Sequence, residues 1–108
     1  MLTVELLYFD GCPSHRALLP RIHEMLEQAG VDTDLHLRRI DTLEAAERER
    51  FLGSPTLRVD GRDVDPGAGV RTDYGLKCRL YETSNGLRGT PPDAWILDAL
   101  AAGAEATR

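Results

Sequence analysis

Cys12 is the residue whose type and position most favour chemistry. An apolar run, Leu2–Phe9, ends shortly before it, and helical periodicity begins at Pro13. Cys12 is therefore expected at the junction of a strand and a helix, near unpaired backbone N–H groups and the positive end of the helix dipole. Such positions lower a thiol pKa from about 8.5 to about 3.5–7.5. His15 lies one turn along the helix and could add a positive charge or a proton. The pattern predicts a thiolate nucleophile at Cys12.

Cys78 is the other cysteine of the chain. Two cysteines are too few for a disulfide scaffold, and their spacing is not that of a CxxC pair. In a reducing compartment most cysteines are buried small hydrophobic residues, and Cys78 could be an inward-facing strand residue of that kind. The alternative is that Cys78 completes a site around Cys12, because the segment before it is long enough to return to that site.

The elements that would position these residues follow from periodicity and turn signals. Leu2–Phe9 has the pattern of a strand covered on both faces, and the helix after Pro13 contains Pro20 and ends at Gly30. Asp60-Gly61 predicts a tight hairpin. The other predicted elements are a strand over Thr33–Asp41, a helix over Thr42–Leu52, hairpin strands over Thr56–Val59 and Arg62–Val64, a strand over Cys78–Glu82, and a last helix with a capping box at Thr90 and Asp93 and a core residue at Trp95.

The element order is thus β-α-β-α-β-β-α, with an insertion at about 66–89 before the last helix. A β-α-β start requires a parallel pair of strands, and the hairpin requires an antiparallel pair. The predicted fold class is α/β with a mixed central sheet flanked by helices. The chain has 108 residues and no linker, so we expect one domain spanning residues 1–108.

These features together resemble the thioredoxin superfamily. Cys12-Pro13-Ser14-His15 occupies the place of the family's CxxC motif, Pro20 matches the proline that kinks its first helix, and Phe51–Leu57 looks like its cis-proline loop. The likeness covers residues 2–64 well and the last helix loosely. The whole resembles small bacterial thioredoxin-like proteins with a single Gly-Cys-Pro near the N-terminus.

The chain also departs from the family's pattern. His15 replaces the second cysteine, Gly11 replaces the usual tryptophan, and Leu6 stands at the place of the buried aspartate. The insertion has no counterpart in a minimal thioredoxin. A dithiol cycle within the motif is therefore impossible.

The resemblance implies a three-layer thioredoxin-like fold and a thiol–disulfide oxidoreductase that needs no cofactor. Cys12 would attack a disulfide, and Cys78 or an external thiol such as glutathione would resolve the mixed disulfide. The partner would be a small thiol or disulfide, or a protein. Ser54-Pro55 is expected to be cis and to face Cys12, with the N–H and C=O of Ser54 open to an extended substrate chain. The residues expected to contact substrate are Asp10, Pro13, Ser54 and Pro55.

Two other functions fit the same residues. Cys12 and Cys78, with His15, suit a soft metal ion such as Cu(I), Zn(II) or Hg(II). With Asp10 they match, in residue type alone, the two-cysteine-plus-aspartate set of organomercurial lyases. The other alternative is a thioredoxin-like binding module without catalysis.

Composition narrows the class of protein. The net charge is −5, and the Lys and Arg residues are scattered among Asp and Glu, so a nucleic-acid partner is not expected. The apolar stretches are far shorter than the roughly 18 residues of a membrane span, and no secretory signal pattern opens the chain. These features predict a soluble, cytoplasmic protein with no membrane partner. The oligomeric state does not follow from the sequence.

Overall fold

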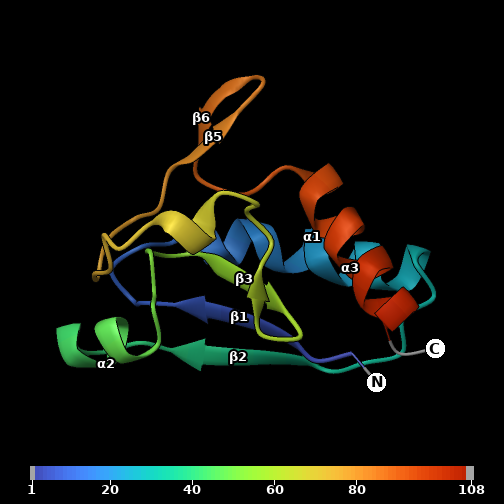
Figure 1. Cartoon of the computed structure of the whole chain (residues 1–108), viewed down its shortest axis with the longest axis horizontal. Helices are drawn as coiled ribbons and strands as arrows, with labels where there is room; N and C mark the ends of the chain where they lie inside the picture. The colour runs from blue at the N-terminus through green and yellow to red at the C-terminus, as the bar shows by residue number, and fades with distance from the viewer. Residues whose placement is uncertain (1, 107–108) are drawn as a thin grey trace.

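A four-stranded mixed sheet forms the centre of the molecule in a computed structural model, which describes residues 2–106 (Figure 1). Its order is β2-β1-β3-β4. β1 pairs in parallel with β2 and antiparallel with β3, and β3 pairs antiparallel with β4. The strands are β1 Val4–Tyr8, β2 Leu35–Arg39, β3 Thr56–Val59 and β4 Arg62–Asp63. The predicted mixed sheet is confirmed.

Helices cover both faces of the sheet. α1 (Ser14–Gln28) and α3 (Asp93–Ala106) pack against one face, and α2 (Leu43–Arg48) lies at one end over the other (Figure 1). Leu6 belongs to the core shared with α1 and α3, whereas Leu7 belongs to a second cluster with Ile40, Ala46 and Phe51. β1 is therefore buried on both faces, as its apolar run predicts. No helix among residues 2–106 is both long enough and apolar enough to cross a membrane.

Local signals in the sequence predict several element ends correctly. Gly30 has a φ of +67° and ends α1, because a residue with a side chain rarely adopts this conformation. The hydroxyl of Thr42 accepts a hydrogen bond from the amide of Ala45 and so caps α2. Asp60 and Gly61 both have positive φ and form the hairpin turn between β3 and β4.

The insertion differs from its prediction. The strand expected over Cys78–Glu82 is divided: Cys78 makes an isolated parallel bridge to Ser54, and β5 (Tyr81–Thr83) begins three residues later. β5 pairs with β6 (Gly86–Arg88) in a separate two-stranded ribbon that projects from the domain (Figure 1). A single-turn 3-10 helix, η1, covers Ala68–Val70.

The predicted capping box before α3 is wrong. α3 begins at Asp93, so Thr90 lies too far before the helix to be its N-cap residue. The Arg21 guanidinium from α1 donates instead to the hydroxyl of Thr90 and to the carboxylate of Asp93. Trp95 was expected in the core but is half-buried, with its ring edge-on to Tyr81.

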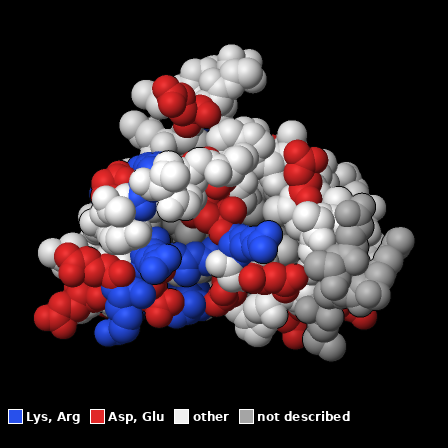
Figure 2. Space-filling view, viewed as in Figure 1, with Lys and Arg blue, Asp and Glu red and all other residues white. Residues whose placement is uncertain are grey.

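Charges on the surface are mixed. On the face in Figure 2, basic side chains gather from the lower left to the centre, and acidic side chains lie directly beside them. Arg38 forms ion pairs with both Glu5 and Glu49, and Arg39 pairs with Asp10 and Asp41.

Candidate thiol site

Cys12 lies in the turn between β1 and α1, and its side chain is fully buried (0% exposed). Its amide donates to the carbonyl of Phe9 and closes the turn. A Cβ atom at Gly11 would lie 2.4 Å from the Phe9 ring, so a larger residue there would displace that ring. The Sγ atom of Cys12 lies 3.6 Å from Oγ of Ser14 and 3.5 Å from the carbonyl oxygen of Ser54.

The proline loop before β3 forms one wall of the site. The Ser54-Pro55 peptide bond is cis, as predicted, and the carbonyl of Ser54 faces the thiol of Cys12. The hydroxyl of Thr56 donates to the carbonyl of Gly53 at 2.6 Å and braces the loop. The loop is buried from Gly53 to Thr56, so its geometry is fixed by packing on all sides.

The other wall is a strap, residues Gly75–Tyr81, which runs alongside the proline loop. The amide of Ser54 donates to the carbonyl of Lys77 at 2.8 Å, and the amide of Arg79 donates to the carbonyl of Ser54 at 2.9 Å. Gly53 allows this approach, because a Cβ atom there would lie 3.0 Å from both the Lys77 carbonyl and the Arg79 Cβ.

The strap brings the two cysteines together. Cys78 bridges Ser54, whose carbonyl faces the thiol of Cys12, and the two thiols are close enough to shift each other's pKa, although Cys78 itself is exposed. The predicted proximity of Cys78 to Cys12 is therefore confirmed. One expectation is wrong: the N–H and C=O of Ser54 are not open to an extended substrate chain, because the strap already uses both groups.

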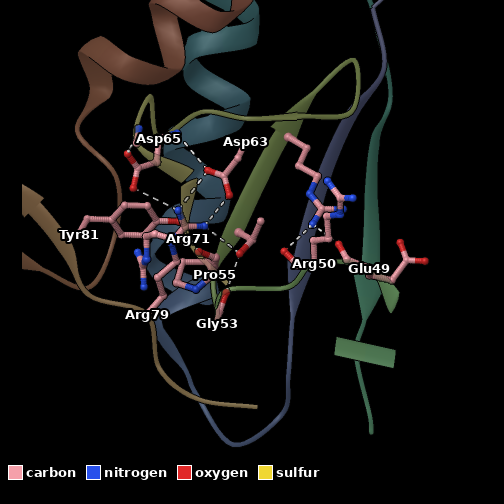
Figure 3. A network of polar contacts seen from close by, with 12 residues as sticks. Glu49, Arg50, Gly53, Pro55, Asp63, Asp65, Arg71, Arg79 and Tyr81 are labelled. Carbon is pink, nitrogen blue, oxygen red and sulfur yellow. Dashed lines mark hydrogen bonds and ion pairs between the residues drawn. The ribbon is translucent and has the colours of Figure 1, made fainter. Parts of the chain in front are cut away.

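Arg79 anchors the strap to the domain (Figure 3). Its side chain is completely buried and forms ion pairs with Asp63 at 2.7 Å and Asp65 at 3.2 Å. It also donates to the hydroxyl of Thr56 and lies over the ring of Tyr81, 4.4 Å from the centroid. The Tyr81 hydroxyl in turn donates to the carbonyl of Pro55. The residues on either side of Cys78 are thus tied to the proline loop and to the end of the β3–β4 hairpin.

The environment of Cys12 favours its thiolate. Burial opposes the charged form, but hydrogen bonds from the Cys78 thiol, from the Ser14 amide and hydroxyl, and from the Ser54 side chain outweigh it and lower the pKa of Cys12. The pKa of Cys78 is raised, first because its thiol donates to Cys12 and then because of burial and the charge on Cys12. The pair therefore holds a single proton over the pH range between its two ionisations. Cys12 is the more acidic thiol, as predicted.

Ser54 contributes a second polar group to the thiol. Its hydroxyl is fully buried and has no hydrogen-bond partner among residues 2–106 while Cys12 is a thiol. Since a buried hydroxyl without a partner costs free energy, an anionic sulfur at Cys12 provides the acceptor that it lacks.

We therefore expect Ser54→Ala to raise the pKa of Cys12, because the variant removes a donor to the thiolate. Ultraviolet thiolate absorbance measured against pH follows this ionisation. Ser84→Ala is the matched control, because Ser84 is an exposed serine of the β5–β6 turn. An unchanged titration in Ser54→Ala would show that the hydroxyl does not stabilise the anion.

Three other predicted site residues do not reach the thiol group. His15 donates from Nδ1 to the backbone carbonyl of Cys12 at 3.0 Å and stacks on Tyr8, so its ring holds the turn instead of facing the sulfur. Asp10 is exposed and pairs with Arg39. Pro13 is exposed and precedes the first residue of α1. The aspartate of the predicted two-cysteine-plus-aspartate set is therefore turned toward Arg39.

Sequence reasoning missed Ser14, Arg79 and Tyr81. Ser14 follows the Cys12-Pro13 pair, and Lys77 and Arg79 flank Cys78. Polar and charged residues at such positions are usually exposed to solvent, so the sequence does not predict a role for them at the thiol. Two aspartates spaced by one residue, Asp63 and Asp65, were the signal available for a buried cation. The cation that pairs with them is Arg79, fourteen residues after Asp65. Nothing in the sequence indicates that these segments lie side by side.

Among residues 2–106, no group of three or more His, Cys, Asp or Glu side chains is arranged to hold a metal ion. Comparison of the chain with protein-family models, with curated proteins and with solved structures finds no match in any of the three.

Proposed function

We propose that this protein is a thioredoxin-like thiol–disulfide exchange protein in which Cys12 and Cys78 cycle between dithiol and disulfide. The thioredoxin-like assignment is supported by the β2-β1-β3-β4 sheet, by helices on both faces and by a cis proline next to a cysteine at a helix start. These features agree with the resemblance found in the sequence at Cys12 and Pro55.

The observation that carries the proposal is the placement of Cys78 beside Ser54, whose carbonyl faces the thiol of Cys12. Cys12 and Cys78 are far apart in the chain, and the isolated bridge between Ser54 and Cys78 holds the strap at the site. The pKa of Cys12 is lowered and that of Cys78 is raised, so Cys12 is the thiol that ionises first. A thiolate adjacent to a second thiol is the arrangement required to form and break an internal disulfide.

The reaction balances with an external disulfide as oxidant. The reduced protein supplies two thiols, one S–S bond of the external disulfide breaks, and the Cys12–Cys78 bond forms as two small thiols leave with the two protons. An external thiol such as glutathione reverses the sequence and reduces the protein again.

Glutathione disulfide tests this function in solution. We expect the reduced protein to release two glutathione molecules per chain and to finish with an internal disulfide. Cys12→Ser and Cys78→Ser should each release only one glutathione and finish as a mixed disulfide. Wild-type protein that ends with glutathione on both cysteines, or that does not react, would contradict the proposal.

A further inference from the structure

Solvent reaches the two cysteines of the pair very unequally. Cys12 is completely buried at the proline loop and the start of α1, whereas Cys78, in the strap beside that loop, is an exposed residue. Thiol–disulfide exchange depends on which sulfur an external molecule can approach, as well as on thiol acidity. The more acidic thiol is here the inaccessible one.

Little local movement is available to uncover Cys12. The strap is paired with both backbone groups of Ser54, and its Gly75 amide donates to the carbonyl of Phe51 at 3.0 Å. On the far side of Cys78, the buried Arg79 holds two carboxylates. Exposing Cys12 by lifting the strap would break these contacts together and leave Asp63 and Asp65 without their cation.

We propose that Cys78 is the sulfur that exchanges with external thiols and disulfides, and that Cys12 is the internal resolving thiol. This inference rests on the proposed function and reverses the two roles expected from the sequence. In the wild-type protein, Cys12, at the helix start, reacts with Cys78, and an external molecule reaches Cys12 only slowly.

Each step balances. In oxidation, the Cys78 thiol passes its proton to the Cys12 thiolate, and the Cys78 sulfur attacks an external disulfide RSSR and releases RS⁻, which leaves a Cys78–SR mixed disulfide. The Cys12 proton passes to the released RS⁻. The Cys12 thiolate then attacks the Cys78 sulfur, breaks its bond to SR and expels a second RS⁻. The products are the Cys12–Cys78 disulfide, one thiol RSH and one thiolate RS⁻, which takes a proton from solvent.

The reverse direction uses the same asymmetry. An external thiolate attacks the exposed sulfur of Cys78, and Cys12 leaves as the thiolate. A leaving thiol of lower pKa departs faster, and the hydrogen bonds from Ser14 and Ser54 lower the pKa of Cys12. The low pKa of Cys12 therefore speeds reduction of the internal disulfide, although the external thiol attacks Cys78 and not Cys12.

Single-cysteine variants with glutathione disulfide test the assignment near pH 8.5, the ordinary cysteine pKa. We expect Cys12→Ser to acquire glutathione on Cys78 at least about tenfold faster than Cys78→Ser acquires it on Cys12, because burial limits access. In denaturing urea the two rates should become equal, which shows that the folded structure causes the difference. Equal rates in the folded variants, or faster reaction at Cys12, would overturn the inference.

The wild-type protein provides a second readout. Oxidised protein is mixed briefly with glutathione and quenched with an alkylating reagent, and peptide masses locate each group. The expected intermediate carries glutathione on Cys78 and the alkyl group on Cys12. The opposite labelling overturns the inference while leaving the proposed function intact, whereas failure to form any internal disulfide removes the proposed function itself.

Discussion

Replacing Arg79 with Ala is expected to lower the free energy of unfolding by about 3–5 kcal/mol. The Arg79 side chain is fully buried, and its removal leaves the carboxylates of Asp63 and Asp65 without their cation in a largely buried setting. It also removes the contact with Thr56 and the packing against the Tyr81 ring. Equilibrium unfolding in urea measures the loss.

Arg71→Ala is the matched control for this experiment. Arg71 pairs with Asp73 on the surface, and exposed ion pairs contribute about 1 kcal/mol or less. Detachment of the strap in Arg79→Ala should also make Cys12 reactive toward alkylating reagents in the folded protein, which Arg71→Ala should not. If Arg79→Ala and Arg71→Ala have the same free energy of unfolding, Arg79 does not anchor the strap.

Oxidation of the cysteine pair is expected to stabilise the protein by about 3–5 kcal/mol. The bond would close a loop of more than sixty residues, and restricting so long a loop lowers the entropy of the unfolded chain. The strap already holds Cys78 beside Ser54, whose carbonyl faces the thiol of Cys12, so the two cysteines lie at one site before the bond forms. Urea unfolding of the oxidised and reduced proteins measures the difference.

Cys78→Ser is the control for the effect of oxidation, because it cannot form the internal bond. Its unfolding should be the same with and without reductant. Equal stability of oxidised and reduced wild-type protein would show that no internal bond forms in the folded state.

Local signals predicted the part of the site that local structure builds. The end of β1, the start of α1 and the Asp60-Gly61 hairpin follow from periodicity and turn residues, and they place Cys12 and Pro55 correctly. The resemblance to the cis-proline loop predicted the cis bond before Pro55. These features depend on residues close together in the chain.

The parts of the site that the sequence did not predict depend mainly on contacts between segments far apart in the chain. The bridge between Ser54 and Cys78 joins segments more than twenty residues apart, and no pattern in either one specifies their register. Arg79 is a charged residue in a polar segment, so composition predicts exposure, yet two distant aspartates make its burial favourable. His15 has the helical spacing expected of a group near the thiol, but its ring faces a backbone carbonyl instead.

Peptide mapping of the protein before and after mild oxidation tests most directly whether Cys12 and Cys78 form a reversible disulfide. The proposed function predicts that the oxidised chain loses two hydrogen atoms, yields one peptide in which Cys12 is linked to Cys78, and regains both thiols with reductant. An oxidised protein whose two cysteines remain unlinked, or which joins to a second chain instead, would contradict it.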